Sequence, residues 1–184
     1  MKSVVFTGAM DYWPNIDAVE WFASDVLPTI RAHRPDVRFF IVGMNPSPRV
    51  QRLAGDGVVV TGRVPDVRPY LQHAAIVVAP LRVARGVQNK VLEAMAMART
   101  VITTPACAAG IEATPDREIV LADDASAFAN AVLAHLASPQ AIGKAARERV
   151  LAEYDWDAKL TGLGRLIEGR RTNSVETTAS IPLA

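Results

Sequence analysis

Short apolar runs rich in valine and isoleucine alternate along this chain with longer segments in which apolar residues recur at helical spacing. This alternation is typical of βαβ units, in which helices cover a parallel sheet. Most of the short runs are continuously apolar, as expected for strands that are buried on both faces. The pattern predicts an α/β, Rossmann-like fold with a parallel six-stranded sheet, whose strands span residues 3–7, 37–42, 58–61, 75–79, 100–104 and 118–121.

The segments between these runs predict the helices. The first helix has the clearest pattern, because Pro14-Asn15 offers a start signal and apolar residues recur at helical spacing until Pro35. Two later segments begin after a proline or a glycine, and the end of the chain is rich in helix formers. The remaining helices are expected over residues 64–71, 86–98, 123–136 and 138–153, and after Trp156.

Composition limits the class of protein. The chain has 184 residues, half of them apolar and 21% charged, which suits one domain with a buried core. Twenty basic and nineteen acidic side chains give a net charge of +1, so we expect no bulk attraction to nucleic acid. No apolar run approaches the roughly 20 residues of a membrane span. We expect a soluble, cytoplasmic domain over residues 1–170 and a polar, disordered tail over 171–184.

The cysteine and histidine content gives little indication of a metal site or of thiol chemistry. The single cysteine, Cys107, cannot form an intramolecular disulfide, and the three histidines show no ligand spacing. We therefore expect no metal site. We interpret Cys107 as a small buried hydrophobe, His73 as a helix-end or surface residue, and the tryptophans as packing residues at helix edges, namely Trp13, Trp21 and Trp156.

Loops that follow the strands of an open parallel sheet are the place to look for a ligand site, because ligands collect beyond the carboxyl ends of the strands. Gly8 follows the first predicted strand and Gly43 the second, and each is either a close backbone approach to a ligand or an ordinary turn. Arg63 and Val64 follow the third. Neither a GxGxxG motif nor a P-loop motif is present, which disfavours NAD enzymes and NTPases.

The loop after the fourth predicted strand carries the strongest signal. Three cations, Arg82, Arg85 and Lys90, surround Gly86, where the start of a helix would offer unpaired N–H groups and a positive dipole to a phosphate. Glu93 shares a helix face with Lys90, and its carboxylate suits the paired hydroxyls of a ribose. The alternative is that Lys90 and Glu93 are a solvated pair and that the arginines only increase solubility. The residues alone favour neither interpretation.

The segment from Gly86 to Ile102 resembles the donor-binding region of retaining GT-B glycosyltransferases of group 1, family 4 type. Within that family the sequence is most similar to bacterial sugar transferases of exopolysaccharide synthesis. The likeness covers about residues 3–168. It also includes Phe6-Thr7-Gly8, Pro14-Asn15, Val42-Gly43, Val60-Thr61-Gly62-Arg63-Val64, Val77-Val78-Ala79-Pro80-Leu81 and Tyr154-Asp155-Trp156.

The resemblance implies that this chain is the C-terminal half of a GT-B enzyme. This half would bind a nucleotide-diphospho-sugar as substrate, with no cofactor and no obligatory metal, while a missing N-terminal domain would bind the acceptor. The expected reaction is sugar transfer with retention, in polysaccharide biosynthesis. The isolated fragment is expected to be inactive, and the full-length enzyme to be able to associate peripherally with a membrane.

The same resemblance assigns roles by position. Glu93 matches a glutamate that holds the nucleotide ribose, and Arg63 and Val64 match the loop that meets the base. Lys90 lies where the diphosphate is cradled. Gly8 is a candidate binding residue because of its place after the first predicted strand. The backbone of the preceding residues would complete this cradle, namely Gly86, Val87 and Gln88.

Arg85 departs from the pattern, because many family members carry a glutamate there that contacts the donor sugar. Either other groups bind the sugar, or Arg85 joins Lys90 as a catalytic cation that stabilises the leaving diphosphate. Arg82 is expected to supply phosphate-binding charge that the loop after the first strand lacks. Two alternatives stay open: a GT-B nucleotide-sugar epimerase or phosphorylase, and a non-catalytic nucleotide-binding module. The segment from Gly86 to Glu93 favours the transferase.

Overall fold

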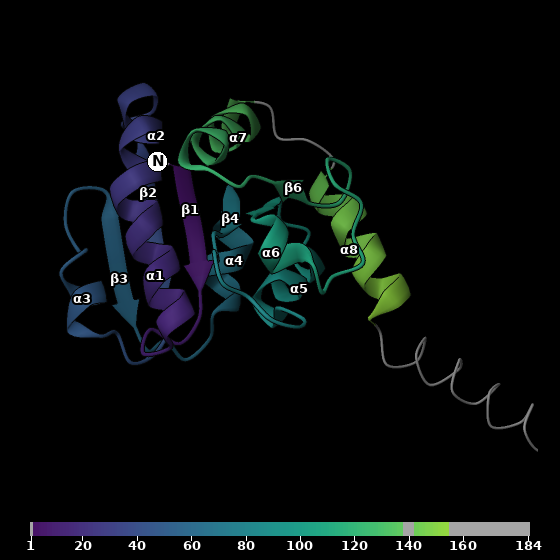
Figure 1. Cartoon of the computed structure of the whole chain (residues 1–184), viewed down its shortest axis with the longest axis horizontal. Coiled ribbons are helices and arrows are strands. Elements are labelled where there is room, and N and C mark those ends of the chain that lie inside the picture. Colours follow the sequence, from purple (N-terminus) through teal and green to yellow (C-terminus); the bar gives the residue numbers. More distant parts are fainter. Residues whose placement is uncertain (1, 138–141, 155–184) are drawn as a thin grey trace, which may run out of the picture.

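The computed structural model describes residues 2–137 and 142–154 (Figure 1). Within them, six strands form one sheet in the order β3-β2-β1-β4-β5-β6, and every neighbouring pair is parallel. The predicted Rossmann-like fold is therefore confirmed. The strands are β1 (Lys2–Thr7), β2 (Val37–Val42), β3 (Val58–Gly62), β4 (Ile76–Ala79), β5 (Val101–Thr103) and β6 (Val120–Leu121).

The strand order creates a switch point beside β1. The chain builds outward from β1 to β2 and β3, then returns to place β4 on the other side of β1. Val4 accordingly pairs with Phe39 of β2 and with Ile76 of β4. Crossovers leave in opposite directions at such a point, so a crevice opens at the carboxyl ends of the strands.

The first helical segment differs from the single helix that the sequence predicts. It consists of α1 (Trp13–Trp21), a π-helical turn η1 (Phe22–Val26) and α2 (Leu27–His33). Pro28 explains the interruption, because proline has no N–H and its ring collides with the carbonyl four residues earlier. The Leu27 N–H instead donates to the Phe22 carbonyl, which widens the helix by one residue at this point.

The other helices follow the prediction with shifted ends. Helix α5 begins at Asn89 rather than at Gly86, because Gly86 has a φ of +65° that an α-helix cannot include. Two short helices were not predicted, although Ser47 and Thr104 accept hydrogen bonds as their N-caps. The remaining helices are α3 (Pro48–Gln51), α4 (Arg68–His73), α5 (Asn89–Ala96), α6 (Pro105–Ala108), α7 (Ala125–Ala137) and α8 (Ile142–Glu153).

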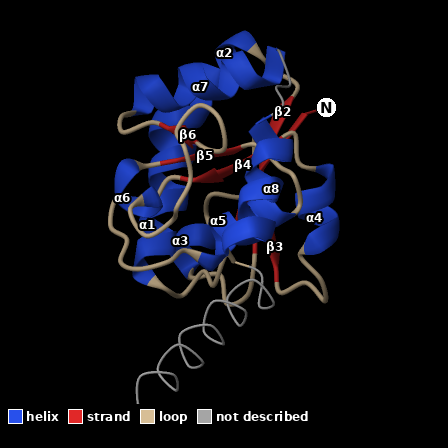
Figure 2. Ribbon diagram, turned by 90° about the vertical axis from the view of Figure 1, so that its right-hand side faces the viewer, coloured by secondary structure: helices blue, strands red, loops and turns tan. Residues whose placement is uncertain are grey.

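Helices lie on both faces of the sheet, and Figure 2 shows α1 and α4 on opposite sides of the strands. A cluster of aromatic rings joins the first helical segment to the sheet and to α7. Phe22 lies 4.5 Å from Phe39 and 6.1 Å from Phe128, measured between ring centres. Trp21 makes an edge-to-face contact with Phe128 at 5.7 Å, so its predicted packing role is confirmed.

Trp13 does not pack as predicted, since 54% of its surface is exposed at the start of α1. The reason is its place before the first buried turn of the helix, beside the equally exposed Tyr12. Cys107 is fully buried and His73 ends α4 as an exposed residue, as the sequence predicts. Trp156, the helix predicted after it and the predicted tail over 171–184 lie outside the described residues.

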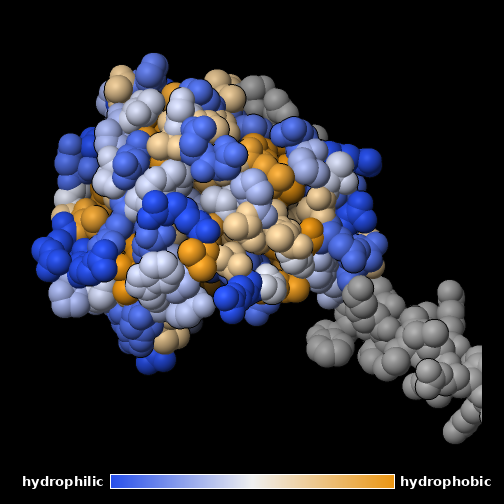
Figure 3. All heavy atoms as spheres, in the orientation of Figure 1, coloured by the Kyte–Doolittle hydropathy of each residue, from blue (hydrophilic) through white to orange (hydrophobic). Residues whose placement is uncertain are grey.

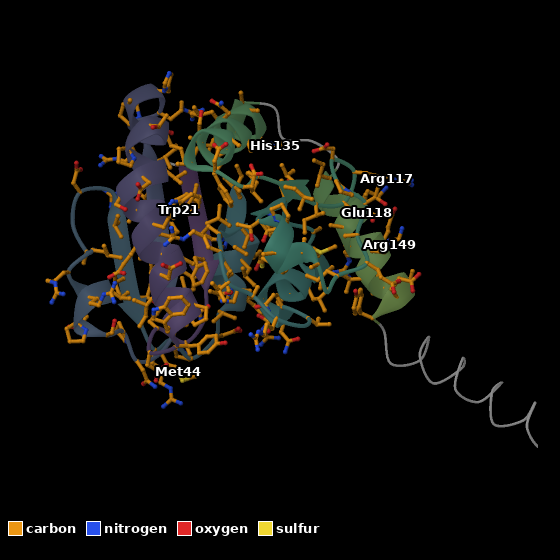
Figure 4. The ribbon with its side chains drawn as sticks, in the orientation of Figure 1. Trp21, Met44, Arg117, Glu118, His135 and Arg149 are labelled. Carbon is orange, nitrogen blue, oxygen red and sulfur yellow. The ribbon has the colours of Figure 1, made fainter. Side chains whose placement is uncertain are left out.

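A buried ion pair attaches α8 to the edge of the sheet. Glu118 is 5% exposed, and it accepts hydrogen bonds from Arg149 and from the Thr114 N–H (Figure 4). Burial alone raises the pKa of Glu118, but these hydrogen bonds outweigh that effect and hold its pKa below the ordinary value. Glu118 thus closes a turn instead of beginning the last strand. No helix among the described residues has the length and apolar character needed to cross a bilayer.

Candidate functional site

A pocket of about 840 Å³ opens at the carboxyl ends of β1, β2 and β3, between the loops that follow them and helix α5. In Figure 1 these strands point toward the lower edge of the molecule, and Figure 4 shows Met44 at that edge. The pocket therefore lies at the switch point, where ligands of doubly wound sheets bind. It is lined by Thr7, Gly8, Ala9, Asn15, Val42, Gly43, Met44, Arg63, Val64, Pro65, Val67, Lys90 and Glu93.

The floor of the pocket consists of two loops that hydrogen bond to each other through their backbones. The Gly8 N–H donates to the Val42 carbonyl at 3.0 Å, and the Met10 N–H donates to the Met44 carbonyl at 2.8 Å. Gly43 is so close to Gly8 that a Cβ atom built on it would lie 1.7 Å from the Gly8 carbonyl oxygen. Glycine is therefore required at position 43 by close backbone approach, rather than by a turn alone.

Lys90 lies in the first turn of α5 and is half-buried. Its ammonium donates a hydrogen bond to the Oδ1 of Asn15 and lies 4.2 Å from the ring centre of Phe6. Burial lowers the pKa of Lys90 to about 8, although the charges of Cys107 and Glu93 act in the opposite direction. The helix has no side-chain N-cap, so its positive end adds to this charge at the same pocket wall.

Glu93 lies one turn further along α5, on the same face as Lys90, and both residues line the pocket. Glu93 is exposed on that wall, and partial burial raises the pKa of its carboxyl while the Lys90 charge acts against the rise. A solvated pair would leave the pKa of Lys90 near its ordinary value. The hydrogen bond of the Lys90 ammonium to Asn15 and its lowered pKa therefore favour a role of Lys90 in the pocket wall over a surface ion pair with Glu93.

The structure brings together half of the residues that the sequence singled out. Gly8, Arg63, Val64, Lys90 and Glu93 line the pocket. The other predicted residues of the cradle form the loop that leads into α5 and do not belong to the lining, namely Arg85, Gly86, Val87 and Gln88. Their predicted binding roles stay predictions.

That loop has its own internal support. The side-chain amide of Gln88 donates to the Arg85 carbonyl at 3.0 Å, so this side chain holds the loop rather than pointing at the pocket. Gly110 packs closely against the same loop, because a Cβ atom there would lie 2.7 Å from the Gly86 carbonyl oxygen. The backbone of Gly86 is thus fixed by contacts from two sides.

Arg82 lies outside the pocket lining and pairs with a residue of α1. Its guanidinium forms two hydrogen bonds with the Asp17 carboxylate of α1 and lies 5.8 Å from the ring centre of Trp21. The side-chain bond with Asp17 raises the pKa of Arg82, as expected for a stable ion pair. Arg82 therefore attaches its loop to α1 and does not line the pocket, so the predicted phosphate-binding role finds no support in its position.

Sequence reasoning missed several lining residues, of which Asn15 is the most informative. It is 5% exposed, and its Nδ2 donates to the Ala9 carbonyl at 2.8 Å. The sequence marks Asn15 as part of a helix start and of a segment that carries the family resemblance, but no local pattern connects it with Lys90, which lies 75 positions away. Thr7 was also missed. Its buried Oγ1 has no hydrogen-bond partner within the described part of the chain.

The chemistry available to the pocket is electrostatic. A desolvated ammonium and the start of a helix favour an anion, and an exposed carboxylate one turn away can accept hydrogen bonds from hydroxyl groups. In residues 2–137 and 142–154, no three histidine, cysteine, aspartate or glutamate side chains gather where they could hold a metal ion.

Comparisons with known proteins identify the family and the fold of this chain. The family described as Glycosyl transferases group 1 matches residues 1–138. Sucrose-phosphate synthase from Thermosynechococcus elongatus has a similar structure, with a TM-score of 0.69 and 26% identity over 94% of this chain and 46% of that protein. A TarM mutant from S. aureus, in a complex that contains UDP, has a TM-score of 0.72 and 17% identity over 90% of this chain and 35% of that protein.

A third similar structure has nearly the same extent as this chain. It is the C-terminal domain of LpcC, a group 1 glycosyl transferase family protein from Francisella tularensis, with a TM-score of 0.64 and 16% identity over 84% of this chain and 87% of that domain. This chain spans about half or less of the first two proteins. No curated protein matches the sequence. The family match covers most of the chain, and the fold is that of one GT-B half: the chain belongs to the group 1 glycosyltransferases.

Proposed function

We propose that this domain binds the nucleoside-diphospho-sugar donor of a retaining glycosyltransferase, whose acceptor-binding groups lie on another domain. The observation that carries the proposal is the desolvated Lys90 ammonium beside the exposed Glu93 carboxylate, on the wall of a pocket at the switch point of the sheet. An ammonium at the start of a helix suits a diphosphate, and a carboxylate can accept hydrogen bonds from the hydroxyls of a ribose. A role in polysaccharide synthesis and a place at the cytoplasmic membrane surface are further expectations of the same proposal.

Each part of the donor has a candidate partner in the pocket. The diphosphate would face Lys90 and the start of α5, and the ribose would face Glu93 one turn deeper. The base would lie against Arg63 and Val64, which follow β3. In transfer, negative charge grows on the leaving diphosphate, and a preorganised cation in a desolvated wall stabilises that charge best.

The surface around the pocket carries exposed apolar side chains that a second domain could cover. Five of the large apolar side chains that are exposed lie in loops or at the start of α1, at the same edge of the sheet, and Figure 3 shows apolar surface in the lower half of that view. We propose that the acceptor-binding domain covers them, since similar proteins are about twice as long. They are Tyr12, Trp13, Met44, Val83 and Val87.

Calorimetric titration of the domain with UDP, GDP and ADP tests the proposal. We expect one nucleotide to bind selectively, and UDP is the first choice because the TarM complex contains it. Glu93→Gln should weaken the binding of that nucleotide about tenfold, which is the effect of losing a charge-assisted hydrogen bond of about 1.5 kcal/mol. Glu148→Gln, an exposed change on α8, serves as the control. Equal affinity of wild type and Glu93→Gln would contradict the assignment of Glu93.

The affinity for the nucleotide should depend on pH in a defined direction. The ammonium form of Lys90 binds the diphosphate, and its pKa in the free domain is about 8. Affinity is therefore expected to be nearly constant around pH 7 and to fall toward tenfold per pH unit above pH 8, until the raised pKa of the complex is passed. Titrations between pH 7 and pH 9 measure this, because the second pKa of the terminal phosphate is about 6 and the charge of the diphosphate is therefore constant over that range. A flat profile would contradict it.

Arg85 favours one alternative, a non-catalytic nucleotide-binding module, because it replaces the carboxylate expected to contact the sugar. Donor binding alone does not separate the two functions. A transfer assay on the full-length enzyme does, because the transferase function predicts activity that Lys90→Ala abolishes. The module function predicts no transfer in either protein.

A further inference from the structure

Asn15 is a buried polar residue whose carboxamide lies between two loops of the pocket. Its Nδ2 donates to the Ala9 carbonyl at 2.8 Å, and its Oδ1 accepts a hydrogen bond from the Lys90 ammonium. These two partners allow only one orientation of the amide, because a carbonyl cannot donate and an ammonium cannot accept. Asn15 is 5% exposed, so its carboxamide is largely shielded from solvent.

The residues around the hydrogen bond between Asn15 and Lys90 leave room for both side chains. A Cβ atom on Gly8 would lie 2.7 Å from the Asn15 Nδ2 and 2.9 Å from the Lys90 Nζ, so only glycine leaves room for both groups. Phe6 presents its ring to the ammonium from the other side, at 4.2 Å. The Lys90 side chain is thus held between an aromatic face and an amide oxygen.

A neutral acceptor at this place has a specific consequence. An amide oxygen stabilises the ammonium but leaves its full positive charge for an anion in the pocket, whereas a carboxylate would neutralise that charge. The ionisable groups whose charges also act on Lys90 are Glu93, on the same helix, and Cys107, which lies in α6. We propose that Asn15 is the positioning residue for Lys90: it orients the ammonium toward the diphosphate and keeps it charged. Because Asn15 also bonds to the Ala9 carbonyl, it fixes the ammonium relative to the loop after β1. The binding part of this inference rests on the proposed function.

The first measurement needs no ligand. The chain has lysine at positions 2, 90, 144 and 159 only, so an NMR titration of the lysine Cε signals can follow Lys90 by itself. Asn15→Asp should raise the pKa of Lys90 by about 1–3 units, and Asn15→Ala should lower it, because the hydrogen bond to the charged form is lost. Asn130→Asp, an exposed change on α7, should leave it unchanged.

The second measurement is UDP titration of the same proteins at pH 7. Asn15→Asp and Asn15→Ala should each bind UDP at least about tenfold more weakly than wild type, the first by neutralising the cation and the second by releasing it. A residue that only supports the fold would lower the melting temperature without moving the pKa of Lys90. If Asn15→Asp does not fold, Asn15→Ser provides the pKa comparison, with the same direction expected as for alanine.

The outcomes separate this inference from the proposed function. An unchanged pKa of Lys90 in the folded Asn15 variants, or unchanged UDP affinity beside a wild type that binds, overturns the positioning role. A wild type that binds no nucleotide overturns the proposed function instead. In that case the pKa values still decide whether Asn15 positions the ammonium.

Discussion

Gly43→Ala is expected to lower the free energy of unfolding by about 3 kcal/mol or more, enough to unfold many domains of this size. The added Cβ would lie 1.7 Å from the Gly8 carbonyl oxygen and 2.8 Å from its carbon, and both are backbone atoms of the adjoining loop. Neither loop can yield easily, because hydrogen bonds at Gly8 and Met10 join them. Urea denaturation measures the loss.

Gly55→Ala is the matched control for that substitution. Gly55 has a φ of +151°, nearly the +152° of Gly43, yet a Cβ there meets nothing within 4 Å. The control therefore carries the dihedral cost alone, about 1–2 kcal/mol. Equal losses in the two variants would mean that the close approach of the pocket loops contributes nothing to the requirement for glycine.

Lys90→Met is expected to weaken UDP binding about 30- to 100-fold, the effect of losing about 2–3 kcal/mol of charge-assisted hydrogen bonding. The same change should alter the free energy of unfolding by less than about 1 kcal/mol, because a desolvated ammonium gives the fold little net stability. Calorimetry and urea denaturation on one preparation measure both quantities.

Lys144→Met provides the matched control, since Lys144 is exposed on α8, outside the pocket lining. Its UDP affinity should equal that of wild type. If Lys90→Met bound UDP as tightly as Lys144→Met, the ammonium would have no part in binding the diphosphate. If it lost stability together with affinity, Lys90 would be a structural residue.

The sheet could be predicted from the sequence because its strands are buried on both faces and read as continuous apolar runs. The predicted ends of the strands were less accurate where contacts of polar residues determine where a strand begins. Glu118 belongs to a turn because Arg149, 31 positions away, pairs with it. The π-helical turn before Pro28 was missed for a different reason, because the apolar spacing around it still fits a helix.

The candidate site could be predicted only where the signal is local. Lys90 and Glu93 are three residues apart on one helix, so their shared face follows from helical geometry. Arg82 has the same local context, but its partner Asp17 lies 65 positions away, and no spacing rule indicates that pair. Asn15 was missed for the same reason, because its importance arises from the contact with Lys90.

The pocket at the carboxyl ends of β1, β2 and β3 is the proposed binding site for a nucleoside diphosphate. The most direct measurement is amide chemical-shift mapping of the domain as UDP is added. Saturable shifts are expected at Gly8, Gly43, Arg63 and Lys90, with none at Asp56 on the opposite end of the sheet. Shifts centred on another surface, or none at millimolar UDP, would contradict it.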